Sequence, residues 1–255
     1  MPNIDRVAPS FLEKIWGSTG LAPWFPEPEK KTGEVWFNSP NLPLIKFLFT
    51  TERLSVQVHP WDEFAREHET ANGKTEMWYI LRAGPGAKVA AGFREPVTKE
   101  AVRNGALSGT IEGMLNWVMV RPGDTIFIPA GTVHAVGAGL AMCEIQQHSD
   151  ITYRLYDYGR PRELHLDKAI EVSNLGPCPA RATLPVKCPY FHTDKLEVRE
   201  ELRKDPIERV CGLIVLAGEG LINGEPFLPG EVYELPAGNE LTVRGNGTIL
   251  RTFIP

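Results

Sequence analysis

The sequence has no excess of positive charge, because 27 Lys and Arg residues are outnumbered by 32 Asp and Glu residues and the formal net charge is -5. Nucleic-acid-binding domains usually concentrate basic residues on one face, so this balance speaks against a nucleic-acid partner. The chain also lacks any run of about 18 apolar residues, the length that a membrane-spanning helix needs. We therefore expect neither nucleic acid nor a membrane as a partner.

Cysteine is scarce and no C-x-x-C pair is present; the four residues are Cys143, Cys178, Cys188 and Cys211. This uneven spacing is not that of a disulfide framework or a zinc knuckle. We expect the four side chains to behave as small buried apolar groups. Residues 1–12 carry charges and no apolar run typical of a secretory signal, which predicts a cytoplasmic protein.

Glycine and proline, in contrast, are abundant, with 24 Gly and 22 Pro in 255 residues. Together they exceed the roughly 12% that these two residues usually contribute. Many tight turns between short strands would use them, so the composition favours a mainly β fold. With 42% hydrophobic residues, the chain can also bury a substantial core.

The sequence pattern supports this fold class. Runs rich in Val, Ile, Phe, Trp and Tyr predict strands at residues 34–37, 43–50, 54–58, 76–81, 88–92, 116–120, 125–128, 141–147 and 151–156. Signals for helices are fewer, and they predict helices at residues 61–69, 98–104, 110–115 and 166–172. We expect a β scaffold that carries a few short helices.

A short motif occurs twice and suggests two related β units. The pattern G-x5-P-A-G begins at Gly123 and again at Gly230. Between the two copies, residues 174–189 are rich in proline and have little hydrophobic pattern, and a second strand-rich stretch follows. We therefore predict a first domain of residues 1–173, a linker of residues 174–189 and a smaller domain of residues 190–255.

The two copies differ at the position where metal chemistry is expected. Three residues after the last glycine, the first copy has His134 and the second has Leu241. Gln57 and His59 lie two residues apart on a predicted strand and so point to one face, and Glu76 opens the next strand. These four side chains form a mixed nitrogen and oxygen set that suits Zn²⁺, with Mn²⁺, Fe²⁺ or Co²⁺ chemically possible.

Each of these residues taken alone could serve the fold or be solvated. The hypothesis of a metal site therefore rests on their combination. The segment from Gly123 to His134 matches G-x5-P-x-G-x2-H, the second motif of the cupin superfamily. A narrower resemblance rests on six segments taken in order: IKFL (45–48), LSVQVHP (54–60), KTEMWY (74–79), PAGTVHA (129–135), EIQQ (144–147) and DITYRLYDYGR (150–160). Together they resemble type I mannose-6-phosphate isomerases in their short bacterial form.

The resemblance implies a cupin, or jelly-roll, barrel as the metal-binding catalytic domain at 1–173. The second copy of the repeat, in which Leu241 replaces the histidine, predicts a degenerate cupin-like β domain at 190–255. The resemblance also implies interconversion of mannose 6-phosphate and fructose 6-phosphate through an enediol, with a phosphosugar as the partner and one Zn²⁺ per chain. The implied metal ligands are Gln57, His59, Glu76 and His134. The implied catalytic residues are Arg154, Lys74 and Asp150, and the implied substrate-binding residues are Lys46 and Glu144.

Several alternatives stay open at this point. An Fe²⁺-dependent cupin oxygenase or a non-enzymatic sugar-binding cupin would use a similar scaffold. Arg154 could instead be a surface residue paired with Asp157, and the proton carrier could be Asp150 or Glu144. The sequence assigns no oligomeric state. It also assigns no role to the remaining histidines, which are His68, His148, His165 and His192.

Overall fold

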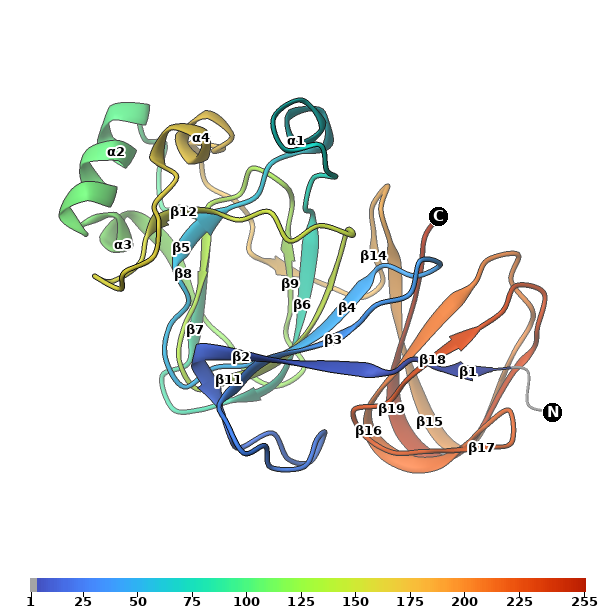
Figure 1. Ribbon diagram of the computed structural model, residues 1–255. Coiled ribbons are helices and arrows are strands. Elements are labelled where there is room, and N and C mark those ends of the chain that lie inside the picture. The colour runs from blue at the N-terminus through green and yellow to red at the C-terminus, as the bar shows by residue number, and fades with distance from the viewer. Residues whose placement is uncertain (1–3) are drawn as a thin grey trace. The chain divides into compact units, whose positions relative to one another are not determined.

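The computed structural model describes residues 4–255, of which 45% lie in strands and 11% in helices (Figure 1). The mainly β class expected from the composition is therefore confirmed. The chain forms two compact units. The first comprises residues up to Phe47 together with Thr183–Pro255, and the second comprises Leu48–Ala182.

The second unit contains a five-stranded antiparallel sheet, which holds most of the residues of interest. Its strands, in spatial order, are β12 (Tyr153–Tyr156), β5 (Val56–Val58), β10 (His134–Val136), β7 (Lys88–Phe93) and β8 (Leu115–Met119). Four further strands of this unit pair in the order β13 (Arg181–Ala182), β9 (Thr125–Ile128), β6 (Glu76–Ala83) and β11 (Leu140–Gln146). Strand β4 (Leu44–Phe49) contains the boundary between the two units.

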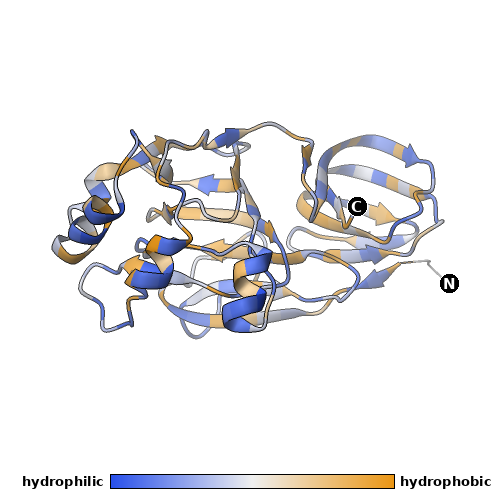
Figure 2. Cartoon of the chain, turned by 90° about the horizontal axis from the view of Figure 1, so that it is seen from above, coloured by the Kyte–Doolittle hydropathy of each residue, from blue (hydrophilic) through white to orange (hydrophobic). Residues whose placement is uncertain are grey.

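The four helices formed by residues 4–255 all belong to the second unit and lie where the sequence predicts them, with small differences at their ends: α1 (Asp62–Glu69), α2 (Lys99–Ser108), α3 (Ile111–Met114) and α4 (Leu166–Glu171). Helix α2 begins because the Thr98 hydroxyl accepts a hydrogen bond from the Ala101 N–H (3.1 Å), and it ends at Gly109, whose φ is 78°. The helices alternate between hydrophilic and hydrophobic residues (Figure 2). Their apolar side chains, Phe64, Val102, Ile111 and Ile170 among them, belong to the core cluster that includes Val56 and Leu155. No helix formed by residues 4–255 is long and apolar enough to cross a membrane.

In the described part of the first unit, all regular elements are strands. Its main sheet follows the order β1 (Asp5–Arg6), β18 (Val232–Leu235), β16 (Cys211–Ile222), β19 (Leu241–Phe253), β15 (His192–Lys204) and β14 (Val186–Lys187), and β17 (Glu225–Phe227) pairs with β16. Two more strands of this unit, β2 (Pro9–Ser18) and β3 (Thr32–Phe37), pair with each other. Leu241 is buried in the apolar core of this unit. Just after the register shift of β16 against β19, Gly218 has a φ of 93°, and a Cβ there would lie 1.9 Å from the Asn246 oxygen, so only glycine fits.

Candidate metal centre and active site

Three neighbouring strands place a row of polar residues on one face of the five-stranded sheet. Arg154 on β12 lies opposite Gln57 on β5, and Gln57 lies opposite His134 on β10. Directly opposed residues of antiparallel strands project to the same side of a sheet. The backbone register therefore directs all three side chains to a common face, although their sequence positions span almost a hundred residues.

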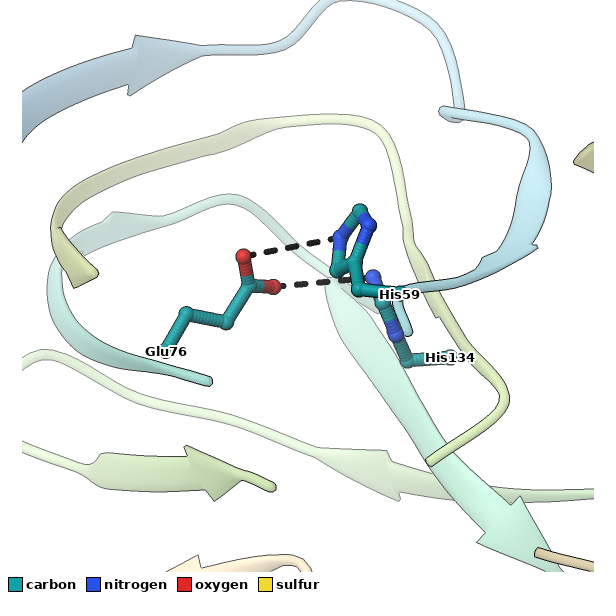
Figure 3. A group of neighbouring side chains, drawn as sticks. All are labelled: His59, Glu76 and His134. Carbon is teal, nitrogen blue, oxygen red and sulfur yellow. Dashed lines mark ion pairs between the residues drawn. The ribbon is translucent and has the colours of Figure 1, made fainter. Parts of the chain in front are cut away.

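His134, one member of this row, converges with His59 and Glu76 (Figure 3). The Nε2 atom of His59 lies 3.6 Å from Glu76 Oε2, and Nε2 of His134 lies 3.5 Å from Glu76 Oε1. Their candidate ligand atoms all lie within 4.8 Å of one another. All three side chains are almost completely buried, so the group could hold a metal ion away from bulk water.

Backbone carbonyls orient both imidazole rings for metal binding. Nδ1 of His59 lies 2.6 Å from the Ile151 oxygen, and Nδ1 of His134 lies 2.9 Å from the Thr132 oxygen. Because a carbonyl oxygen can only accept, each Nδ1 must carry a hydrogen and donate it. In a neutral ring the other nitrogen, Nε2, then carries no hydrogen, and in both residues Nε2 faces Glu76, which is the arrangement of metal-binding histidines.

The surroundings of His134 favour its neutral form. The pKa of His134 is lowered to about 4, mainly by burial and also by the charge of Lys74, against the opposing effects of the Thr132 hydrogen bond and Glu144. At neutral pH the ring is uncharged and offers a lone pair. A neutral imidazole is the form that coordinates a metal.

Lys74 is buried beside the same candidate metal ligands. Its Nζ atom lies 2.7 Å from Glu76 Oε2, 3.0 Å from His59 Nε2 and 4.0 Å from Glu144 Oε1. Although Glu76 Oε2 has this ion pair, no hydrogen bond of good geometry reaches it in the described residues. Glu76 Oε2 and His59 Nε2 thus both lie close to the positive charge of the Lys74 ammonium. Electron-pair donors arranged around positive charge in this way also suit a divalent cation.

Gln57 completes the group from the adjoining strand. Its amide Nε2 lies 3.2 Å from Nε2 of His134 and can donate to it, while its Oε1 accepts a hydrogen bond from the Ser55 hydroxyl (3.0 Å). A half-turn of the amide would exchange the two atoms and present the oxygen toward His134. The Ser55 hydroxyl could then accept instead of donate, so this rotation would leave its hydrogen bond intact.

Two residues without a role in the sequence analysis support the site from β6 and β11. Trp78 lies opposite Glu144, and its indole N–H donates to Glu144 Oε2 (2.9 Å). Gln146 lies opposite Glu76, is fully buried, and leaves Oε1 without a hydrogen-bond partner among the described residues. The only signal for them in the sequence was their spacing. Trp78 lies two residues after Glu76 and Gln146 two residues after Glu144, so each points to the same face of its strand as that glutamate.

Arg154 is half-buried and makes no ion pair within residues 4–255, and its Nε atom is buried without a hydrogen-bond partner. Asp157 instead accepts hydrogen bonds from Arg160 and Arg162. Burial lowers the pKa of Arg154, and the charge of Arg162 adds to this effect while Asp157 opposes it. The interpretation of Arg154 as a partner of Asp157 is therefore wrong.

The remaining two predicted residues lie outside these contacts. Asp150 is exposed, and its carboxylate has no hydrogen bond or ion pair in the described part of the chain. Lys46 belongs to the first unit, where it is buried and its ammonium lies 4.2 Å from the centre of the Trp36 ring. The roles of both residues stay predictions.

The known proteins that this chain resembles share one described activity. No family model matches the chain. The mannose-6-phosphate isomerase ManA of Bacillus subtilis is 34% identical to it, over 90% of this chain and 92% of that protein. A mannose-6-phosphate isomerase of Streptococcus mutans is 36% identical over 70% of this chain and 62% of its own length.

Solved structures agree with these sequence matches. The crystal structure of the mannose 6-phosphate isomerase from Bacillus subtilis matches with a TM-score of 0.88 and 30% identity, over 98% of this chain and 99% of that one. A mutant of phosphomannose isomerase from Salmonella typhimurium matches with a TM-score of 0.78 at 17% identity, over 99% of both chains. The second match supports the fold alone.

Proposed function

This chain belongs to the mannose-6-phosphate isomerase family, and on that premise we propose that it interconverts mannose 6-phosphate and fructose 6-phosphate. The observation that carries the proposal is the buried group of His59, Glu76 and His134, of which His134 lies on the five-stranded sheet that also carries Arg154. Together these residues would bring two sources of positive charge, a metal and a guanidinium, to one sugar.

We propose one Zn²⁺ per chain, held by His59, Glu76, His134 and the rotated amide of Gln57. Two imidazole nitrogens with two oxygen co-ligands, from Glu76 and the Gln57 amide, are a donor set that suits zinc. When bound, the metal supplies positive charge close to the sugar oxygens on which negative charge develops. Lys74 would balance the carboxylates of Glu76 and Glu144, both of which face its ammonium.

The reaction moves a proton between C1 and C2 of the sugar through an enediol, so negative charge grows on the two adjacent oxygens. We propose that Arg154 donates to these oxygens. Its planar guanidinium can donate to both at once, and the buried Nε atom has no competing partner in the described residues. Such donors lower a barrier because they are aimed in advance at the developing charge.

We propose Asp150 as the proton carrier and Glu144 as a substrate-binding group. Asp150 lies shortly before Arg154 on the chain, and its carboxylate has no ion pair in residues 4–255 that would occupy it. Both oxygens of Glu144 already face donors, namely Trp78 and Lys74. Lys46 and Lys74 would bind sugar hydroxyls or the phosphate.

A coupled assay that measures fructose 6-phosphate formed from mannose 6-phosphate, run beside elemental analysis, tests the proposal. We expect turnover that requires about one zinc per chain, is lost on chelation and returns on adding zinc. Oxygen uptake by an iron-loaded sample would instead indicate the oxygenase. Binding of a sugar phosphate without turnover would indicate a sugar-binding protein.

A further inference from the structure

The unpaired edge of β12 bears on how Arg154 is held in place. β12 is the terminal strand of the five-stranded sheet, so only one of its edges pairs with a strand, β5. That pairing is irregular between Arg154 and Tyr156, where the register shifts. The β5 ladder alone therefore holds the backbone at Arg154 only weakly, although the position of this guanidinium matters for the reaction.

His165 binds the free edge at this point. Its backbone N–H donates to the Arg154 oxygen (2.8 Å), and the Arg154 N–H donates to the imidazole Nδ1 of His165 (3.2 Å). Both polar backbone groups of Arg154 are thus bound by one residue, as a neighbouring strand would bind them. The His165 backbone also begins helix α4, because the Ala169 N–H donates to its oxygen (2.8 Å), and so the clamp is attached to a folded element.

This clamp requires a particular form of the ring. Nδ1 can accept from the Arg154 N–H only if it carries no proton, so the ring must be neutral with its hydrogen on Nε2. Nε2 lies 3.9 Å from the exposed carboxylate of Glu163. A protonated ring would present a second donor to the Arg154 N–H, and the hydrogen bond would be lost.

The groups around the ring favour the neutral form. Burial lowers the pKa of His165, and the charges of Arg154 on β12 and Lys168 on α4 lower it further. Glu163 and Glu69, the latter on α1, act in the opposite direction. The ring of Tyr153, 6.0 Å away between centroids, completes the surroundings and carries no charge, since its hydroxyl donates to Glu69.

We propose that His165 is a positioning residue for Arg154, whose neutral imidazole fixes the backbone that carries the guanidinium and whose protonation opens the clamp. The inference rests on the proposed function, in which Arg154 acts on the sugar. Small displacements of a catalytic group can cost large factors in rate, because the reacting atoms must be held in place.

Two substitutions separate this role from a general effect on folding. His165→Leu removes the Nδ1 acceptor and keeps apolar bulk, and we expect kcat to fall about tenfold, with KM within about twofold of the original protein. His165→Asn places an amide oxygen near the Nδ1 position, and we expect it to recover most of the lost kcat. His192→Leu is the matched control, because His192 is also a partly buried histidine of lowered pKa but contacts Phe253 in the first unit.

The pH profile gives the second readout. As the pH falls through the lowered pKa of His165, kcat of the original protein should decline, whereas kcat of His165→Asn should decline less. Zinc content, measured at each pH, must be equal in the two proteins for this comparison. An unchanged kcat in His165→Leu, a His165→Asn variant no better than the leucine variant, or identical acid limbs would each overturn the inference.

The clamp can also be observed without turnover. In the ¹⁵N-labelled protein, the Arg154 amide resonance should titrate together with the His165 ring, and this titration should vanish in His165→Asn. An amide that titrates in a protein without isomerase activity would leave the clamp standing and refute the proposed function. An active protein whose Arg154 amide ignores the ring would refute the clamp alone.

Discussion

Arg154 is the residue whose environment departs most from that of an ordinary surface arginine. Asp157, the acid nearest to it in the sequence that could neutralise it, is instead occupied by Arg160 and Arg162. Two arginines thus hold this one buried carboxylate, and the guanidinium of Arg154 is left without an ion pair in the described residues. This excess of positive charge favours an anionic ligand or a developing oxyanion.

Substituting Arg154 by lysine should test this role directly. Lysine keeps the charge and loses the planar pair of donors, and the loss of a preorganised donor costs about 3 kcal/mol, or on the order of a hundredfold in kcat. Zinc content and melting temperature should stay close to those of the original protein. Arg181→Lys is the control, since Arg181 is an exposed arginine paired with Asp124. Normal turnover in Arg154→Lys would make Arg154 a structural residue.

At the proposed metal centre, His134→Ala should lose zinc and activity together. One of the four proposed ligands would be missing, and an incomplete shell binds the metal weakly. His68→Ala provides a comparison, because His68 stacks on Phe64 within α1 and contributes no ligand atom to the group. Stoichiometric zinc in purified His134→Ala, measured by elemental analysis, would contradict the proposed ligand set.

The lowered pKa of His134 predicts how stability depends on pH in the metal-free protein. The ring binds a proton with a pKa of about 4 when folded and 6.5 when unfolded, so the unfolded chain takes up the proton first. Stability from this residue is fully present above pH 6.5, and about 3 kcal/mol is lost as the pH falls to about 4. Urea unfolding in chelator should follow this course, and His134→Leu should depend less on pH. Equal slopes in the two proteins would argue against the shifted pKa.

At the scale of strands and helices, local sequence patterns were sufficient to predict an element's position wherever its apolar residues follow one clear period. The expected strand at residues 125–128 corresponds to β9, and the expected helix at residues 61–69 corresponds to α1. Strand β2 was missed because its hydropathy does not follow its burial: the apolar Phe11 and Ile15 are exposed, whereas Lys14 is half-buried. Strand β10 has only three residues, and its turn motif predicted the position of His134 better than any hydrophobic pattern did.

Phase along a strand predicted faces but not partners. It placed Gln57 and His59 together, yet only the register of β5 against β12 and β10 shows that Arg154 and His134 flank Gln57. The hydrogen bond from Trp78 to Glu144 depends on the pairing of β6 with β11, which no local pattern specifies. The clamp at His165 joins residues in different elements, so a single sequence offered no signal for it.

At the scale of the whole chain, the degenerate repeat is the feature with the clearest physical consequence. Where the first copy has buried His134, the second has Leu241 in an apolar core. A leucine there contributes packing and cannot bind a metal. We therefore keep the proposal of a catalytic domain at 1–173, a linker at 174–189 and a metal-free cupin-like domain at 190–255, whose boundaries stay a prediction.

Removal of this C-terminal part should be costly for the molecule. Strand β1, near the N-terminus, pairs with β18, and the Trp24 indole donates to the Leu216 oxygen (2.8 Å), so residues from both ends of the chain share one core. A truncation after Pro185 would remove most strands of the first unit and expose unpaired edges and apolar faces.

We expect this truncation to yield insoluble protein, or soluble protein with a clearly lower melting temperature. Deletion of Ile254 and Pro255 alone is the control, because these residues follow β19, lie exposed and should be dispensable. Solubility, thermal melting and kcat/KM would be measured side by side for the three proteins. We expect this loss of stability because a core that loses most of its strands cannot stay equally stable. A soluble truncation that melts and turns over like the full chain would therefore show that residues 186–255 are not needed to cover the remaining apolar faces.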